Sequence, residues 1–208
     1  MLISIIIMEL FYEGLRFFIP DNVYEPSEDS FMLANGAKLA RGFVLDVGCG
    51  CGLASLVCAK NEKNKVLGTD LNPDAVRCAI QNAQNNNIKN VSFLESNLFS
   101  NIPKSKFDAI LFNPPYLPTE YNERIDGQLN IAFDGGKDGR KVLDLFLAEF
   151  DRYLKPEGSL FLLQSTLNGP RKTRSKLKNL GYSVIILEKK RFFFESIYLF
   201  KASRISKP

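Results

Sequence analysis

The chain has 208 residues, of which 45% are hydrophobic and 24% charged, with a formal net charge of +4; this fits one globular domain and excludes disordered and fibrous proteins. It contains no histidine, which excludes Ser-His-Asp hydrolysis, Cys-His proteolysis and imidazole-ligated metal sites. The four cysteines form no C-x-x-C pair, so neither a disulfide framework nor a zinc site is expected, and a reducing cytoplasm is favoured.

The first twenty-four residues predict a short hairpin and no membrane segment. The apolar run at residues 1–8 lacks the length of a membrane span and the basic region of a signal peptide. It is either a β-prone start or an upstream extension with Met8 as the initiator. Residues 10–24 alternate apolar and polar positions around Glu13-Gly14, which predicts a small hairpin.

A helix is predicted next, capped by Ser27 or a neighbouring acid and ending near Ala40. Asp29 and Ser30 lie in its first turn, which either only caps the helix or faces a ligand. Because no repeat, low-complexity tract or linker follows, we expect residues 1–208 to form a single domain, with residues 1–41 as an extension of it.

A strand, a glycine-rich loop and a helix follow. The apolar run at residues 43–47 leads into Gly48-Cys49-Gly50-Cys51-Gly52 and then into helical spacing up to Lys60, the arrangement of a nucleotide site in an α/β fold. The dinucleotide pattern would need a third glycine at position 53 or 55, which hold leucine and serine. The loop is instead G-x-G-x-G, with Asp46 two residues before its first glycine.

The next strand, at residues 66–70, ends at Asp70, 22 residues after Gly48. A carboxylate at this end of a strand can accept hydrogen bonds from both hydroxyls of a ribose. Pro73 should open a second crossover helix, and a third strand is predicted at residues 91–95.

Asn113-Pro114-Pro115-Tyr116 directly follows the apolar strand predicted at residues 107–112. Asn113 offers a side-chain carbonyl, the prolines stiffen the backbone and remove its donors, and Tyr116 offers a flat ring for stacking. Acceptors beside a ring suit a planar NH2 group, as in an amide or an exocyclic base amine. The motif alone is equally compatible with an ordinary proline-rich turn.

From residue 117 to 138 the chain is polar and rich in turn residues, and loops of this length are usually functional lids or disordered. A helix at 141–154, a strand at 158–164, a helix at 171–180 and a strand pair at 182–188 and 192–200 complete the prediction. Residues 171–208 hold 11 Lys or Arg against 2 Asp or Glu. This basic region is either a solvated helix face or a docking surface for an RNA-rich or acidic partner.

The order and spacing of these motifs resemble a class I S-adenosylmethionine (SAM) methyltransferase. Within that class, V-Y-E-P-S-E-D-S-F at residues 23–31 and D-G-G-K-D-G-R at residues 134–140 are similar to the short HemK-like branch of archaea and eukaryotes. The resemblance runs from about Tyr12 to Phe200. It implies a Rossmann-like α/β fold with a seven-stranded, mostly parallel sheet, helices on both faces and an antiparallel terminal strand.

The resemblance also implies the site residues. The methionine moiety of SAM is assigned to Ser30, Asp46, Gly48, Gly50 and Gly52, the ribose to Asp70 with Leu71 beside it, the adenine to Asn97 and Leu98, and the target amide to Asn113, Pro114 and Tyr116, with Asn113 also near the cofactor. The family usually has aspartate where Asn97 stands, so we expect weaker SAM binding. Cys49 and Cys51 fill positions that need small residues, and no metal is expected.

Members of this branch methylate the glutamine side chain in the Gly-Gly-Gln motif of class 1 translation release factors, often together with a small zinc-binding activator protein. The resemblance therefore implies a release factor as the substrate and an activator docked along the strand at residues 91–95. Asn113 Oδ1 and the Pro114 carbonyl would accept the two amide hydrogens and Tyr116 would pack on the amide plane, so no histidine base is required.

Two rival functions remain open from the sequence. Methylation of adenine N6 in DNA or RNA would use the same acceptors and stacking, although the chain has no room for a sizeable target-reading domain. The other rival is a SAM-binding scaffold without activity, which the asparagine at position 97 favours and the intact N-P-P-Y motif and Asp70 oppose.

Overall fold

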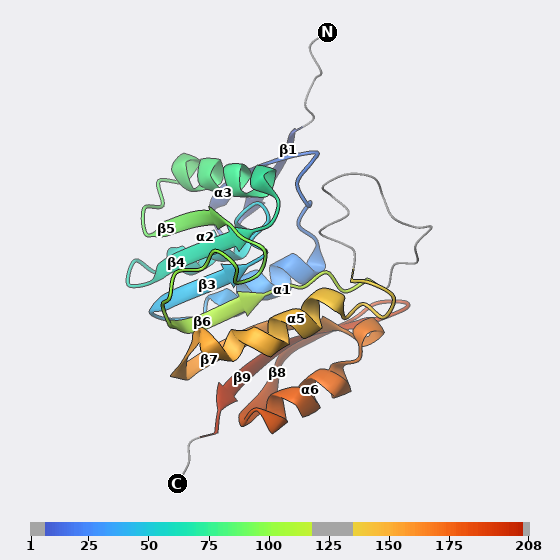
Figure 1. Ribbon diagram of the computed structural model, residues 1–208. Coiled ribbons are helices and arrows are strands. Elements are labelled where there is room, and N and C mark those ends of the chain that lie inside the picture. Colours follow the sequence, from blue (N-terminus) through green and yellow to red (C-terminus); the bar gives the residue numbers. More distant parts are fainter. Residues whose placement is uncertain (1–6, 118–134, 206–208) are drawn as a thin grey trace.

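A single seven-stranded sheet runs through the computed structural model, which describes residues 7–117 and 135–205 (Figure 1). Its strands are β3 (Phe43–Val47), β4 (Lys65–Asp70), β5 (Val91–Glu95), β6 (Phe107–Phe112), β7 (Leu154–Ser165), β8 (Tyr182–Arg191) and β9 (Ser196–Arg204). They lie in the order β5-β4-β3-β6-β7-β9-β8. The first five pair in parallel, and β9 is antiparallel to both β7 and β8. The predicted Rossmann-like fold is confirmed.

Helices cover both faces of this sheet (Figure 1). The helices are α1 (Glu28–Ala37), α2 (Leu53–Ala59) and α3 (Pro73–Asn85) on one face, with α5 (Lys141–Glu149) and α6 (Pro170–Asn179) on the other. Neighbouring strand residues therefore enter different cores: Val44 packs with the first group of helices and Leu45 with the second. Burial on both faces explains why these strands are continuous apolar runs.

The order in which strands are added to the sheet switches from one side of β3 to the other between β5 and β6. From β3 it moves outward through β4 to the edge strand β5, then returns to the other side of β3 as β6. In open α/β sheets, ligands bind at such a switch point, outside the carboxyl ends of the strands. The glycine loop after β3, Asp70 at the end of β4 and N-P-P-Y after β6 all lie at this edge.

The predicted N-terminal hairpin is confirmed as β1 (Ile7–Tyr12) and β2 (Leu15–Pro20). Glu13 and Gly14 both have positive φ, 53° and 76°, as in a type I′ turn. The hairpin docks on α3 through asparagines: Asn82 Oδ1 accepts from Phe18 N at 2.9 Å, and Asn86 Oδ1 accepts from Arg16 N at 2.9 Å. Side chains of a helix thus complete backbone hydrogen bonds of β2.

Three predicted boundaries are wrong. The helix expected at residues 141–154 ends at Glu149, because a 3-10 turn, η2 (Phe150–Arg152), and then the start of β7 follow. That strand begins at Leu154, four residues before the prediction, with a register shift against β6. The last strand begins at Ser196, because Phe192 N donates to Glu195 O at 2.8 Å and closes a turn there.

Two other expectations meet the structure only in part. The lid or disorder expected for residues 117–138 falls mainly on residues 118–134, which lie outside the described residues, as do residues 1–6. Within the described ranges, no helix combines the length and apolar character needed to cross a membrane.

Candidate active site

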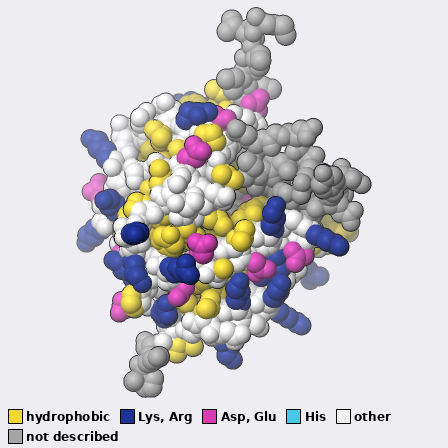
Figure 2. Space-filling model, viewed as in Figure 1, with side chains coloured by type: hydrophobic (Ala, Val, Ile, Leu, Met, Phe, Trp, Pro, Cys, Tyr) yellow, Lys and Arg dark blue, Asp and Glu magenta, His cyan; other side chains and the backbone are white. Residues whose placement is uncertain are grey.

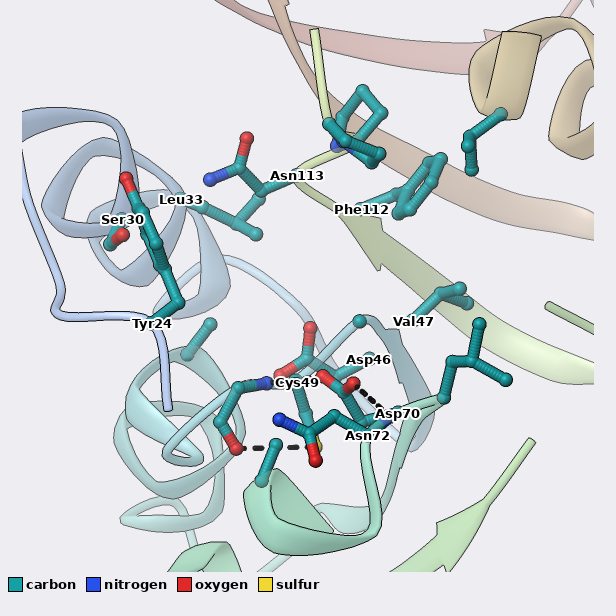
Figure 3. A pocket seen from close by; sticks show the side chains of 18 of the residues that line it. Tyr24, Ser30, Leu33, Asp46, Val47, Cys49, Asp70, Asn72, Phe112 and Asn113 are labelled. Atoms are coloured by element: carbon teal, nitrogen blue, oxygen red, sulfur yellow. Dashed lines mark hydrogen bonds between the residues drawn. The ribbon is translucent and has the colours of Figure 1, made fainter. Parts of the chain in front are cut away.

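One cavity of about 230 Å³ lies at the carboxyl ends of β3, β4 and β6, beside the start of α1 (Figure 3). It brings together nearly all of the residues predicted from the sequence. Those that line it are Ser30, Asp46, Gly48, Gly50, Asp70, Leu71, Asn97, Leu98, Asn113, Pro114 and Tyr116.

Gly52 is the predicted cofactor contact that does not line the cavity. It is the N-cap of α2, with φ +87°, and a Cβ there would lie 3.1 Å from the Cβ of Ala79. The glycine at this position is therefore required by a left-handed backbone and by the close packing of α2 against α3.

The cofactor corner, which we define as the loop 48–52 with Asp70, is held by backbone donors. Gly50 N donates to Asp70 Oδ2 at 2.8 Å, and Asn72 N donates to Asp70 Oδ1 at 2.9 Å. Burial raises the pKa of Asp70, and these two N–H groups counteract that shift. Gly50 has φ +55°, so the conformation that turns its N–H toward Asp70 favours glycine.

Asp46 lies behind this corner and is 1% exposed. Ser55 Oγ donates to its Oδ2 at 2.6 Å. Burial raises the pKa of Asp46 to about 7, with a smaller upward contribution from the charge of Asp70, while the Ser55 hydrogen bond lowers it. The charge at this position therefore changes close to neutral pH.

The acceptor corner, which we define as residues 113–116 with Asp29, is held by side chains. Asn113 Nδ2 donates to Asp29 Oδ2 at 3.1 Å, and the Tyr116 hydroxyl donates to the same oxygen at 3.3 Å. Asn113 Oδ1 is buried and has no hydrogen-bond partner among the described residues. Figure 3 shows the Asn113 amide nitrogen turned toward the side of the cavity where Tyr24 and Ser30 lie.

The hydroxyls around Asp29 remain donors. Burial, followed by the charge of Asp29, raises the pKa of Tyr116 and raises the pKa of Tyr24 to about 12. Because neither phenol ionises near neutral pH, both tyrosines keep a proton with which to donate. The contact between Asp29 and Asn113 joins residues 84 positions apart, and no local pattern in the sequence indicated it.

Residues 135–140 of the D-G-G-K-D-G-R stretch lie directly behind N-P-P-Y. Gly139 has φ +67°, and a Cβ at this position would lie 2.3 Å from the Tyr116 carbonyl oxygen. Gly135 N donates to Leu117 O at 3.1 Å. Arg140 is 3% exposed, and its Nη1 donates to Asn168 O at 2.5 Å. The stretch therefore braces the acceptor corner, a role that the sequence alone did not assign to it.

The remaining predicted residues are Asn97 and Leu98, after β5, and Cys49 and Cys51 of the glycine loop, and all four line the cavity. Asn97 is exposed, and Leu98 has φ +49° and is held by a hydrogen bond of 2.9 Å from Ser96 Oγ to its carbonyl. Burial raises the pKa of Cys49 and Cys51, which keeps both thiols protonated. Within residues 7–117 and 135–205, no three His, Cys, Asp or Glu side chains are grouped to hold a metal ion.

Comparisons with known proteins show the family of the chain. Residues 29–126 match the model of the methyltransferase small domain. A relative from Methanocaldococcus jannaschii, provisionally named a protein N5-glutamine methyltransferase, is 48% identical over 194 residues, which are 93% of this chain and 98% of the relative. Methyltransferase HEMK2 of Mus musculus is 30% identical over 170 residues, 77% of this chain and 79% of that protein.

A solved structure adds a match in three dimensions. The E. cuniculi Mtq2–Trm112 complex, described as responsible for methylation of the eRF1 translation termination factor, contains a chain with a TM-score of 0.67 and 26% identity, covering 88% of this chain and 99% of that one. Because relatives of at least 30% identity match over most of their length, this chain belongs to the HemK-like family of class I SAM-dependent methyltransferases, in the short branch that includes archaeal and eukaryotic members.

Proposed function

We propose that this methyltransferase transfers a methyl group from SAM to the side-chain nitrogen of the glutamine in the Gly-Gly-Gln motif of a class 1 translation release factor. The observation that carries the proposal is Asn113 Oδ1, a buried acceptor without a partner among the described residues, in the same cavity as the glycine loop. A buried acceptor is costly unless a ligand satisfies it. The name of the relative from Methanocaldococcus jannaschii supports a glutamine amide as that ligand, and the eRF1-methylating complex supports a release factor as the protein that carries it.

The residues of the cofactor corner fit SAM. Asp70 is half-buried beside the glycine loop, where its carboxylate can accept the ribose hydroxyls. Asp46 can place a negative charge near the cationic methionine moiety, next to Gly48, Gly50 and Ser30. Leu71, Leu98 and Asn97 would surround the adenine. When bound, SAM supplies an activated methyl group on a sulfonium.

At the acceptor corner, the chain's own task is to orient a weak nucleophile. The amide nitrogen must approach the methyl group in line, so its two hydrogens have to be held by fixed acceptors. Asn113 Oδ1 and the Pro114 carbonyl would serve as these acceptors and would stabilise the positive charge that develops on nitrogen. Tyr116 would pack on the amide plane. Once methylated, the cationic nitrogen is acidic and releases one of its two hydrogens to water, so no histidine base is needed.

The same proposal includes an activator protein on β5. This strand lies at one edge of the sheet, and an edge strand offers unpaired backbone groups to a partner.

Contact of the basic C-terminal region with nucleic acid stays a prediction. Figure 2 shows Lys and Arg side chains over the region of α6. Lys172 Nζ lies 3.6 Å from Asp144 Oδ2 and Lys176 Nζ lies 3.8 Å from Asp144 Oδ1, so part of the charge of α6 is paired within the chain.

Transfer of labelled methyl groups tests the proposal directly. The chain, with and without a candidate activator, is incubated with labelled SAM and with a release factor, its Gly-Gly-Gln→Gly-Gly-Ala variant, total RNA or total DNA. We expect label on the release factor alone and none on its variant. Label on nucleic acid would support adenine methylation, and no label on any acceptor, with SAM binding intact, would support an inactive scaffold.

A further inference from the structure

A single buried carboxylate links the start of α1 to the acceptor corner. Asp29 is the second residue of α1 and is 2% exposed. Its Oδ2 accepts hydrogen bonds from Asn113 Nδ2 at 3.1 Å and from the Tyr116 hydroxyl at 3.3 Å. One side chain from α1 therefore holds two residues of the N-P-P-Y motif.

The other oxygen of Asp29 is committed to donors of its own helix. Asp29 Oδ1 accepts from the backbone N–H of Ser30 at 2.6 Å and from Ser27 Oγ at 2.7 Å. A backbone N–H can only donate, so Oδ1 must be an acceptor and the carboxylate cannot turn away. The Asn113 amide that meets Oδ2 must therefore present its NH2 group to it.

The orientation of the Asn113 amide follows from this contact. Because Nδ2 is held by Asp29, the acceptor of the side chain, Oδ1, makes no bond to α1. Oδ1 is buried without a partner among the described residues. The two ends of an asparagine amide have nearly the same size. Without a fixed acceptor on one side, nothing in the shape of Asn113 selects which end faces the substrate.

We propose that Asp29 is the positioning residue that turns the acceptor end of Asn113 toward the substrate nitrogen and keeps the donor end away from it. The inference rests on the proposed transfer to an amide nitrogen, whose NH2 group can only be held by acceptors. In the opposite orientation, the NH2 of Asn113 would face the NH2 of the substrate, and the two donors would repel each other.

Asp29→Asn is the sharpest single test. The oxygen of the new amide stays with the Ser30 N–H, so its NH2 replaces Oδ2 and faces Asn113, which then turns round and presents its own NH2 to the substrate. We expect kcat to fall about a hundredfold, as for loss of a fixed catalytic contact, while the Kd for SAM, measured by calorimetry, changes less than threefold. Asp108→Asn, the same change in a carboxylate that accepts from Phe43 N and Lys155 Nζ, is the matched control and should keep wild-type kcat.

A double variant separates orientation from simple loss of stability. In Asp29→Asn/Asn113→Asp, the new amide at position 29 donates to one carboxylate oxygen at position 113, and the other oxygen again offers an acceptor to the substrate. We expect kcat at least tenfold above that of Asp29→Asn alone. A purely structural role for Asp29 predicts no difference in kcat between the two variants, because both keep a hydrogen bond between positions 29 and 113, to the turned amide of Asn113 in Asp29→Asn and to the carboxylate in the double variant.

Assays of the wild-type chain distinguish a failure of the proposed function from a failure of the role proposed for Asp29. If the wild-type chain labels RNA or DNA instead of the release factor, the proposed substrate is wrong, and the same variants are compared on that amine. A kcat of Asp29→Asn within threefold of wild type, or a double variant no better than the single one, would overturn the positioning role.

If thermal denaturation shows that Asp29→Asn is not folded, the single variant Asn113→Asp tests the proposal instead. It places two carboxylates against each other, so one must hold a proton to keep the contact. Its kcat relative to wild type should then fall as the pH rises from 6 to 8. A ratio that is constant over this range would contradict the proposal.

Discussion

The two corners of the cavity use a carboxylate in different ways. In the cofactor corner, Asp70 accepts from the backbone N–H groups of Gly50 and Asn72, whose positions are set by the loop and the strand end themselves. In the acceptor corner, Asp29 accepts from the side chains of Asn113 and Tyr116, which can rotate. The cofactor corner is therefore fixed by the backbone of one βαβ unit, whereas the acceptor corner depends on a contact between distant segments.

The largest effect should come from removing the acceptor itself. Asn113→Ala deletes the buried Oδ1, so we expect kcat to fall about a hundredfold or more, with little change in the Kd for SAM. Steady-state kinetics and calorimetry measure the two quantities. Asn85→Ala changes an asparagine at the end of α3, whose Oδ1 accepts from Gln81 Nε2 at 3.0 Å, and should leave both values at wild type. Near-normal turnover of Asn113→Ala would remove the role proposed for this residue.

The sequence was sufficient to predict the cofactor corner because its parts are contiguous. Asp46 lies near the end of β3, the glycine loop follows this strand and Asp70 ends β4. The carboxyl ends of these parallel strands lie side by side, so topology alone brings the residues together. The sequence also placed Asn113 and Tyr116 correctly after β6. Only Gly52 was assigned to the cavity by its place in the motif, although its glycine serves the start of α2.

The support of the acceptor corner could not be predicted, because it is made across long stretches of chain. Asp29 was recognised as a helix-capping or ligand-facing acid, but its bond to Asn113 depends on how α1 packs on the sheet. Nothing in the sequence explained why position 139 requires a glycine. The structure explains this requirement, because a Cβ at position 139 would lie 2.3 Å from the Tyr116 carbonyl oxygen.

Substitution of Asp70 should disrupt the cofactor corner. Asp70→Ala removes the acceptor for the Gly50 and Asn72 N–H groups and the proposed partner of the ribose, so SAM binding should weaken at least tenfold, since hydrogen bonds to charged groups are worth about 1.5–3 kcal/mol. Calorimetry measures this directly. Asp70→Asn keeps one acceptor oxygen and should lie between the alanine variant and wild type. If Asp70→Ala binds SAM as tightly as wild type, the ribose assignment fails.

The bracing of the acceptor corner predicts a stability difference between two glycines. Gly139→Ala and Gly181→Ala both place a side chain at positive φ, +67° and +85°, which costs about 1–2 kcal/mol in each case. Only Gly139→Ala also collides with the Tyr116 carbonyl, which should add about 1–3 kcal/mol. Urea unfolding should therefore show the larger loss for Gly139→Ala, accompanied by lower kcat. Equal losses would show that the close approach relaxes without cost.

The smallest effect concerns the charge of Asp46. Its pKa of about 7 means that the carboxyl is mostly neutral at pH 6 and mostly charged at pH 7.5, and a negative charge attracts the cationic methionine moiety of SAM. The affinity for SAM should therefore rise by up to about eightfold over this range, the ratio of the charged fractions at the two pH values. Calorimetry at both pH values measures the rise, and Asp46→Asn should remove it. An unchanged slope in Asp46→Asn would assign the pH dependence to another group.

Stability without SAM should respond in the opposite direction. Because burial raises the pKa of Asp46 above its ordinary value of 3.8, the folded state holds the proton more tightly than the unfolded state. This contribution to stability is fully present below about pH 4 and is lost as the pH rises through about 7. SAM binding is therefore strongest at the pH values at which the charged Asp46 makes the SAM-free protein least stable. Urea unfolding between pH 6 and 7.5 should show a wild-type stability that falls with pH in the absence of SAM and is nearly constant with saturating SAM, because the rise in affinity offsets the loss. The stability of Asp46→Asn should be constant in both conditions.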